Sequence, residues 1–405
     1  MKRLTLLLLG LALGVSATAN AQGLTMQMSN GWTFTFAGNV NVFWVFSKAN
    51  VNAGDASNSN IRTGLLPTFA TFEAKGKEGG LTLGVHFGFA PQIQNPDQCH
   101  DNFILTCTNG GAPNLGTQAG AQIDMRQVYL TIGLKDGSQI LAGRELGLFG
   151  RQNILQDMTL FGVGAVGGAQ AGGTTLGRIG YGYIYPNFNA QLTYSTKPGQ
   201  AQLSIGLFQP STIAGNGTFT FTTVPRVEAE FTYNQKSGKT RYMVWAGGLW
   251  QTTKDAATGG TSLSSFGGTV GVKAELSDLS VVVTGYIGKG IGTVLMFGDA
   301  TGVGGGVAGS GVDARPSDGG YAQVMYKVGP KTNVGASWGF SRLKNDQTGD
   351  GNTAVIANWA SYTVGIYHQW TRSLKLVFEG TREEQGAGGG APAQVDVSGG
   401  FMLFF

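Results

Sequence analysis

Charged residues are scarce in this sequence. Asp, Glu, Lys and Arg make up 12% of the 405 residues, about half of the usual ~25%. That fraction is too low for the surface of an ordinary soluble protein. Disorder is also excluded, because 41% of the residues are hydrophobic and 10% are aromatic, whereas disordered chains are poor in both. The chain is therefore expected to fold, and much of its surface has too little charge for a surface that faces water.

Long apolar runs are missing as well. The longest nearly uninterrupted run covers residues 4–15, whereas a membrane-spanning helix needs about 20 apolar residues. The mean hydropathy is only +0.01, which is too polar for a bundle of such helices. Helical membrane proteins are therefore excluded.

The amino-terminal segment has the three parts of a secretory signal peptide. Lys2 and Arg3 form a basic start, residues 4–15 are apolar, and Ala19-Asn20-Ala21 is a small-residue cleavage site. We expect cleavage after Ala21, with residues 1–21 as signal peptide and 22–405 as one mature domain. Loss of Lys2 and Arg3 leaves 27 − 2 = 25 basic and 23 acidic residues. This near balance gives no indication of a nucleic-acid partner.

Cysteine is nearly absent, with two residues in the whole chain, which excludes a disulfide framework. Cys99 and Cys107 lie eight positions apart in one segment that is expected to be a loop. An oxidising periplasm would favour a disulfide between them that constrains this loop. A metal site with His100 is the alternative, but it lacks a clear fourth ligand.

The main signal in the body of the chain is an alternation with a period of two. In residues 32–46 the even positions are apolar or glycine, with aromatics at both ends, and most odd positions up to 41 are polar. Residues 226–234, 332–341 and 394–405 alternate in the same way. No stretch beyond the leader shows a convincing period of 3.6 residues. The chain is therefore expected to be all-β.

A soluble sandwich would also alternate, but segment length argues for a membrane. Soluble strands usually have about 5–6 residues, whereas several segments here reach the ~9–11 that a tilted strand needs to cross a bilayer. Aromatics at the segment ends are typical of the girdles of a transmembrane barrel. Such a barrel satisfies every backbone polar group in lipid. A wet inner face and a lipid-facing outer face also explain the neutral hydropathy.

The connections alternate between short and long, as in outer-membrane barrels. The seven short turns are expected near residues 76–79, 135–137, 197–200, 235–239, 277–278, 329–330 and 371–373. The eight long loops are expected near residues 47–65, 91–122, 146–175, 211–224, 252–261, 289–318, 344–357 and 383–393. Together they separate sixteen antiparallel strands and place both termini in the periplasm.

One segment, residues 176–196, does not fit this scheme simply. Its apolar parity switches at Pro186-Asn187. A bulge at that point keeps the count at sixteen strands. A turn there would require eighteen, because bacterial barrels have even strand numbers. We favour the bulge.

Several features resemble the general diffusion porins of Gram-negative outer membranes. The last strand ends in Phe405, with Phe401 and Leu403 on its apolar side, which is similar to the signal read by the barrel-assembly machinery. Residues 126–134 and 140–144 are similar to the porin strands that precede the third loop.

The resemblance covers the mature chain. It implies a homotrimer, passive diffusion of small hydrophilic solutes, and a third loop, here residues 146–175, that folds inward and narrows the pore. This loop lacks the Pro-Glu-Phe-Gly-Gly stretch of enterobacterial porins.

A pore of this kind needs charges on its inner wall, since they bias the passage of ions. Strand parity places seven charged side chains in the lumen: Arg226, Glu228, Glu230, Lys273, Glu275, Lys375 and Glu379. Parity likewise predicts that Arg144 and Arg178 point inward. The parity of Arg126 is ambiguous, and only the resemblance places it inward.

The predicted constriction is a basic wall of Arg126, Arg144 and Arg178. It is expected to face Asp157 and Glu145, with Arg151 on the third loop nearby. The alternative is that each arginine is simply a solvated lumen charge.

The histidines are expected to have ordinary roles. The parity of His86 predicts a lumen residue, and His368 is predicted at the periplasmic interface. None is placed to pair with a serine and an acid, as a hydrolase would require.

The sequence therefore predicts an outer-membrane channel rather than an enzyme, with no cofactor. Its expected partners are the lipid bilayer, other copies of the chain, the assembly machinery and small solutes. A substrate-specific channel is the alternative within transport, although no ladder of aromatics or lysines is visible. A barrel enzyme and a surface adhesin are the alternatives from other classes.

Overall fold

The computed structural model describes residues 23–51, 54–94, 123–166, 174–212, 219–255, 262–297, 314–344, 357–386 and 393–405. The predicted signal peptide, residues 1–21, lies outside the described residues, as do Cys99, His100 and Cys107. Within the described part of the chain, no helix is both long enough and apolar enough to cross a membrane.

The described residues form a 19-stranded sheet and one short helix, α1 (Arg151–Leu155). The strands are β1 (Leu24–Gln27), β2 (Thr33–Val51), β3 (Gly54–Arg62), β4 (Phe69–Glu78), β5 (Leu81–Pro91), β6 (Ile123–Gly133), β7 (Gln139–Leu146), β8 (Phe188–Ser195), β9 (Ala201–Phe208), β10 (Phe219–Phe221), β11 (Arg226–Ser237), β12 (Thr240–Asp255), β13 (Ser262–Leu276), β14 (Leu279–Lys289), β15 (Pro316–Lys327), β16 (Thr332–Leu343), β17 (Ala357–Gln369), β18 (Leu374–Gly386) and β19 (Ala393–Phe404).

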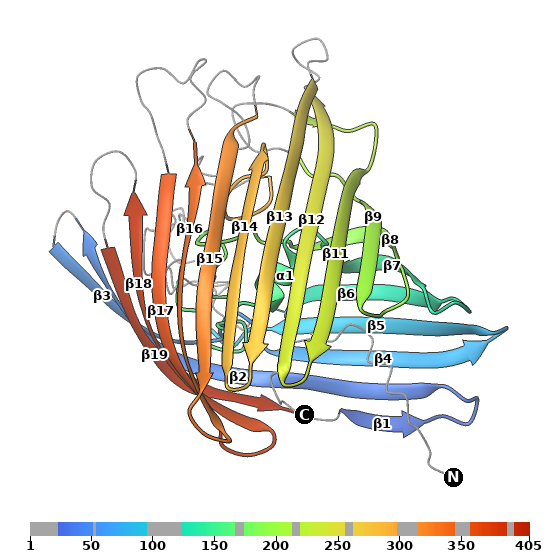
Figure 1. The fold of residues 1–405 in the computed structure, drawn as a ribbon, viewed down its shortest axis with the longest axis horizontal. Coiled ribbons are helices and arrows are strands. Elements are labelled where there is room, and N and C mark those ends of the chain that lie inside the picture. Colours follow the sequence, from blue (N-terminus) through green and yellow to red (C-terminus); the bar gives the residue numbers. More distant parts are fainter. Residues whose placement is uncertain are drawn as a thin grey trace, which may run out of the picture.

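The sheet closes on itself into a barrel (Figure 1). Its wall consists of β2, β4 to β9 and β11 to β19, and each strand pairs antiparallel with the next. The first and last strands of this wall, β2 and β19, pair with each other and close the ring. The wall therefore has 1 + 6 + 9 = 16 strands, which confirms the all-β, sixteen-stranded barrel. Three further strands pair with the ends of wall strands: β1 and β3 pair with β2, and β10 pairs with β12.

All seven predicted short turns are hairpin connections of this wall. The tightest join Glu78 to Leu81, Ser237 to Thr240, and Leu276 to Leu279 across two residues each. They lie at one rim, because the strands alternate in direction. The carboxyl terminus lies at the same rim, since the Phe404 amide donates a hydrogen bond to the Ser373 carbonyl in the last turn.

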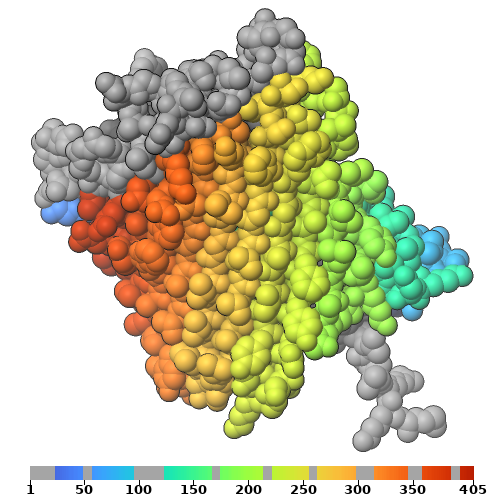
Figure 2. Space-filling view, turned by 45° about the horizontal axis from the view of Figure 1, so that its top comes forward, coloured from blue at the N-terminus to red at the C-terminus, as the bar shows by residue number. Residues whose placement is uncertain are grey.

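The two faces of the wall have the predicted composition. On β2, Trp44 is 44% exposed on the outside whereas Asn41 is fully buried on the inside. The exposed large hydrophobic residues of the other wall strands continue this outer apolar surface. Figure 2 shows the outer wall as a continuous surface from β9 (green) to β18 (red-orange). Such a surface is suited to lipid, because removing apolar side chains from water is favourable and transmembrane barrels face the bilayer with an apolar band.

The first long loop differs from the prediction. Residues 47–65 were expected to be a loop, but β2 continues to Val51 and β3 pairs with it from Gly54 to Arg62. The polar side chains of this segment had suggested a loop. The hairpin of β2 and β3 shows that strand pairing continues beyond the apolar part of β2. The alternation of apolar and polar residues could not predict this extension, because the added segment is mostly polar.

The prediction of one bulged strand over residues 176–196 is wrong, although the count of sixteen is right. Only β8, from Phe188 onward, is a strand of the wall. The preceding residues belong to the third loop and contain three glycines with positive φ, Gly177, Gly180 and Gly182. A regular strand cannot accommodate these backbone angles. The apolar alternation here reflects packing inside the barrel: Tyr181 and Tyr183 are fully buried rather than lipid-facing.

The third loop folds into the lumen, as predicted, but it is longer than expected. It leaves the wall after β7 and returns at β8, so it covers residues 147–187 and includes α1 (Figure 1). We call residues 147–166 and 174–187, its described parts, the inward loop. Residues 290–297, which follow β14, pack against it: the Tyr185 amide donates to the Val294 carbonyl at 2.9 Å.

Candidate functional site

The inward loop is attached to one side of the barrel wall by hydrogen bonds of α1. The Asn153 side-chain oxygen accepts a hydrogen bond from the indole N–H of Trp245 on β12 at 2.8 Å. The Asn153 carbonyl accepts from the hydroxyl of Tyr321 on β15 at 2.7 Å. Both partners are buried. Since buried polar groups need partners, these bonds fix the position of α1 against β12 to β15.

A second attachment lies on β18. The Glu379 carboxylate accepts hydrogen bonds from the backbone amides of Val163 and Gly164 at 3.1 and 2.7 Å, and from the Tyr367 hydroxyl at 2.9 Å. Lys375, on the same strand, donates to the Phe161 carbonyl at 2.7 Å. Both charged residues point inward, as predicted, but they hold the loop rather than face open water.

Asp157 and Arg178 form a third attachment. The Asp157 carboxylate accepts from the Arg178 amide at 3.0 Å and from the Tyr183 hydroxyl at 2.9 Å. The Arg178 guanidinium is fully buried and donates to the backbone carbonyls of Ser337 and Ser361, each at 2.7 Å. Burial lowers the pKa of Arg178 below its usual range, and nearby Asp157 opposes this shift. An arginine keeps its charge in proteins, so the buried cation depends on these acceptors.

This finding corrects the predicted constriction. Arg178 and Asp157 were expected to face each other across a water-filled neck on the assumption that residues 176–196 form a strand. They lie instead within the same loop, packed against β16 and β17. Both side chains are buried and neither borders open water in the lumen.

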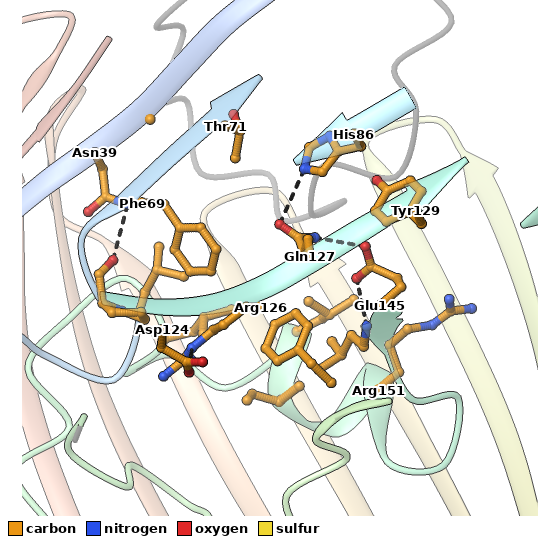
Figure 3. Close-up of a pocket in the computed structure, with 18 of the residues that line it drawn as sticks. Asn39, Phe69, Thr71, His86, Asp124, Arg126, Gln127, Tyr129, Glu145 and Arg151 are labelled. Carbon is orange, nitrogen blue, oxygen red and sulfur yellow. Dashed lines mark hydrogen bonds and ion pairs between the residues drawn. The ribbon is translucent and has the colours of Figure 1, made fainter. Parts of the chain in front are cut away.

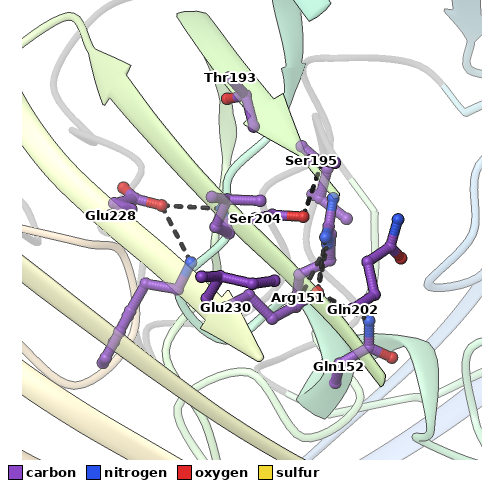
Figure 4. Close-up of polar contacts among 12 residues, drawn as sticks. Arg151, Gln152, Thr193, Ser195, Gln202, Ser204, Glu228 and Glu230 are labelled. Carbon is purple, nitrogen blue, oxygen red and sulfur yellow. Dashed lines mark hydrogen bonds and ion pairs between the residues drawn. The ribbon is translucent and has the colours of Figure 1, made fainter. Parts of the chain in front are cut away.

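Ion pairs of β11 hold the beginning of the inward loop (Figure 4). Arg151 lies 2.5 Å from the Glu230 carboxylate, which also accepts from the Gln152 side chain at 3.2 Å. The Glu228 carboxylate accepts from the amides of Leu148 and Phe149 at 2.8 and 2.9 Å.

Arg226 completes this row of inward-facing charges on β11. Its Nε lies 2.8 Å from Glu228, and its Cζ lies over the rings of Phe208 and Phe297, 5.4 and 5.3 Å from their centres. Arg226, Glu228 and Glu230 thus point into the barrel, as parity predicted.

A cavity of about 580 Å³ lies in the lumen, between the inward loop and the opposite wall of β4 to β7 (Figure 3). Its charged and polar lining comes mainly from the wall. This lining consists of Asn39, Thr71, Glu73, Lys75, His86, Gln92, Asp124, Arg126, Gln127, Tyr129, Thr131, Gln139 and Glu145, together with Arg151 and Thr174 of the inward loop. Arg126, Glu145 and Arg151 are therefore the predicted constriction residues that line this cavity.

A polar network runs across this wall. The Gln127 side chain donates to Glu145 at 2.8 Å and lies 3.3 Å from Nε2 of His86. The His86 ring stacks on Tyr129 with ring centres 4.8 Å apart, and Glu73 lies 3.8 Å from its Nδ1. His86 is thus a lumen residue, as its parity indicated.

A β-bulge explains why the parity of Arg126 was ambiguous. Gly88 pairs with Gln127 and Phe89 pairs with Met125, so Arg126 is the extra residue of β6. An extra residue shifts the alternation by one position. Arg126 therefore faces the cavity, where its Nε lies 2.9 Å from Asp124.

Arg144 lies on the outer face, contrary to the prediction. It pairs across the sheet with Val128 and Ala190. Both share a face with the exposed outer side chains Leu130 and Leu192 of their own strands. The neighbouring position, Glu145, is the one that lines the cavity. The alternation holds, but its apolar face was assigned to the wrong side: Leu141 lines the cavity together with Glu145, so Arg144 belongs to the outer face of β7.

Lys273 and Glu275 point inward, as predicted, but line a separate cavity. Their side chains form an ion pair of 3.0 Å, and Arg241 lies 3.7 Å from Glu275. Together with Gln156 of the inward loop they border a space of about 300 Å³ close to the β11–β12 turn.

Most of the lining of this cavity was not predicted. Glu73 and Lys75 could have been found, since they alternate with Phe72 and Ala74 in β4. Most of the apolar part had no such signal, because it comes from irregular segments. The apolar part consists of Leu65, Leu66, Pro67, Ile154, Leu155, Leu160, Phe161, Leu176, Ile179, Tyr185 and Leu295, with Phe69, Val85, Leu141, Leu146, Phe188 and Phe404 of the wall.

Among the described residues, no cluster of three or more His, Cys, Asp and Glu side chains could hold a metal ion. His368 is engaged at the rim of short turns, where its Nδ1 lies 2.8 Å from the Thr332 hydroxyl.

No protein-family model matches the sequence, and no curated protein matches it. Solved structures do match over nearly the whole chain. The outer membrane channel DcaP of Acinetobacter baumannii is 14% identical, with 94% of this chain and 99% of that chain covered and a TM-score of 0.63.

Two porins match in the same way. The anion-selective porin from Comamonas acidovorans is 14% identical, with 92% and 100% of the two chains covered and a TM-score of 0.59. OmpF of Salmonella typhi is 11% identical, with 94% and 100% covered and a TM-score of 0.55. The chain therefore has the barrel fold of the Gram-negative outer-membrane porins.

Proposed function

We propose that this protein is an outer-membrane channel for the passive diffusion of small solutes and ions. The observation that carries the proposal is the cavity of about 580 Å³ between the inward loop and β4 to β7, with charged and polar side chains on its wall. A channel needs such a polar passage inside an apolar barrel. The similarity of the fold to channels and porins supports the same proposal.

The charges in this cavity favour a channel with weak ion selectivity. Lys75, Arg126 and Arg151 are opposed by Glu73, Asp124 and Glu145 among the lining residues. Since the two signs balance, neither cations nor anions gain a large advantage. A substrate-specific channel is the second candidate, and the feature that favours it is the apolar part of the cavity lining.

The test is conductance of the purified protein in planar lipid bilayers. Stepwise, ohmic openings in KCl are the expected result. A reversal potential under a KCl gradient then reports selectivity, and we expect a value close to zero. Bilayers that stay closed would contradict the channel, and would leave the enzyme and the adhesin as candidates.

We also propose the route to the membrane that the sequence predicts. Residues 1–21 are removed as a signal peptide, and Phe401, Leu403 and Phe405 are read during barrel assembly. Phe401 and Leu403 are exposed on the outer face, and the Phe405 ring packs 5.1 Å from that of Phe36. Mass spectrometry of the protein from outer membranes should give a chain that starts at Gln22; an intact leader would contradict this.

We propose a homotrimer, as the resemblance to general porins implies. The exposed Arg144 on β7 supports contact with another protein surface, because an arginine facing lipid costs free energy, up to ~2–4 kcal/mol at mid-membrane. Native mass spectrometry in detergent should show three copies. A monomer that conducts normally would contradict the trimer without affecting the channel.

A further inference from the structure

The main cavity has two faces of different chemistry. The wall of β4 to β7 contributes most of its charged groups, whereas the opposite side is almost entirely aliphatic or aromatic. A passage for purely hydrophilic solutes has no need of such a side. The contrast indicates that solutes meet apolar surface on one side and polar groups on the other.

The apolar side is one continuous cluster. Leu65, Ile154, Leu155, Leu160 and Ile179 pack together as buried residues, with Leu66, Leu146, Phe161, Leu176 and Tyr185 packed against them. All ten of these residues also border the cavity. They belong to the inward loop, to the end of β7 and to the segment after β3. The cluster thus serves as the core of the loop and presents one surface to the lumen.

The polar side offers both signs of charge close together. Lys75 and Glu73 form a pair of 2.8 Å, and Arg126 and Asp124 form one of 2.9 Å. These pairs keep part of their side-chain surface exposed. Such pairs can exchange contacts with a solute that carries both charges, at little electrostatic cost.

We propose that the channel favours small amphiphilic solutes, in particular zwitterions with an apolar side chain, such as aliphatic amino acids. The apolar part would lie along the leucine-rich side while the ammonium and carboxylate groups follow the charged wall. This inference rests on the proposed channel function and names the solute class of the same cavity. Partial burial of the apolar group of the solute makes entry favourable. The free energy gained is small, so the solute can leave again.

Two solutes of nearly equal size provide the test. L-leucine and L-asparagine are both zwitterionic at neutral pH, and differ in the polarity of the side chain. Swelling of proteoliposomes containing the full-length mature protein reports their rates of entry, and ribose serves as a hydrophilic reference. We expect L-leucine to enter roughly threefold faster than L-asparagine, because a few tens of Å² of apolar surface leave water.

Variants of the apolar side connect this preference to the cavity. Leu66→Asn combined with Leu176→Asn should bring the ratio of L-leucine entry to L-asparagine entry close to one. Both side chains pack against the buried cluster but are partly exposed, so the buried members of the cluster stay in place; each single variant carries the test if the double variant does not insert. Leu81→Asn, at the turn end of β5 and outside the cavity, should keep the wild-type ratio.

The outcomes separate this inference from the function on which it rests. Equal rates for the two amino acids, with ribose entry intact, would overturn the solute class and leave the channel standing. A preference for L-leucine that persists in the double variant would overturn the assignment to the apolar side. Absence of both KCl conductance and ribose entry would overturn the channel itself.

Discussion

Arg126 and Arg144 show how strongly a single extra residue affects the wall. Both are arginines on neighbouring strands that lead to the inward loop, yet one faces the cavity and the other faces outward. The bulge at Arg126 shifts the alternation of β6 by one position, whereas β7 is regular and keeps Arg144 on the outside. The charge of the pore at this level therefore depends on the bulge.

The two arginines provide a matched pair for a selectivity measurement. Arg126→Glu places a second carboxylate beside Asp124 in the cavity, and the reversal potential in a KCl gradient should shift toward that of a cation-selective pore. Arg144→Glu makes the same charge change on the outer face and should leave the reversal potential unchanged. A shift of equal size in both variants would contradict the placement of the two side chains.

Glu379 has a structural role that its charge does not suggest. Its carboxylate accepts two backbone N–H groups of the inward loop. In Glu379→Leu both donors lose their acceptor, at a cost of about 1–3 kcal/mol for each buried group. We expect a lower unfolding midpoint in urea and noisier single-channel currents. Glu384→Leu on the same strand is the control, because Glu384 is paired with Arg382 away from the loop.

At the scale of elements, the inward loop determines the shape of the lumen. It is bonded to the wall from β11 to β18 and stands apart from β4 to β7, so the larger of the two cavities lies on the side of β4 to β7. Glycines of the wall make this close approach possible. A side chain at Gly339 of β16 would begin 2.1 Å from the Tyr181 carbonyl of the loop, well inside contact distance.

Gly339 therefore provides a test of the loop position. In Gly339→Val the loop must shift away from β16 toward the cavity, and KCl conductance should fall. The thermal stability of the folded barrel on a gel should fall as well, since overpacking typically costs ~1–3 kcal/mol. Gly380→Val is the control, because a side chain there meets nothing closer than 3.8 Å. Unchanged conductance in Gly339→Val would show that the loop does not lie against β16.

At the scale of the whole molecule, the barrel combines an apolar exterior with a polar interior lined by the loop. Val364, in the middle of β17, is 60% exposed on the outside. Gln139 of β7 lines the cavity. The same substitution at these two sites should have different consequences, because one side chain faces lipid and the other faces the lumen.

Val364→Arg should destabilise the protein by about 2–4 kcal/mol if the site lies near the bilayer midplane. Urea unfolding in lipid vesicles, followed by tryptophan fluorescence, measures this change. Gln139→Arg should change the free energy of unfolding much less, since its charge stays in a polar space. Equal destabilisation would mean that the outer face of β17 does not contact lipid.

The strand architecture was predictable from the sequence because it rests on local rules. A period of two follows from backbone geometry, and turn residues close hairpins between neighbours in the chain. The alternation of Val40, Asn41, Val42 and Trp44 therefore survives in the structure. The charges of β11 pointed inward for the same reason.

The path of the inward loop could only be decided by the tertiary structure. Its anchors join residues far apart in the chain: Arg178 bonds to Ser337 and Ser361, and Glu379 bonds to Val163 and Gly164. No local pattern encodes such partners. The same holds for the bulge at Arg126, because an extra residue is defined only relative to its partner strand.

The sequence by itself thus determined a sixteen-stranded barrel with an apolar outside and a charged inside, since alternation and turns act between neighbouring residues. The tertiary structure decided which charges border open space and which hold the loop. That distinction depends on contacts across the lumen, where Arg178 and Asp157 are buried together while Arg126 and Glu145 face the cavity.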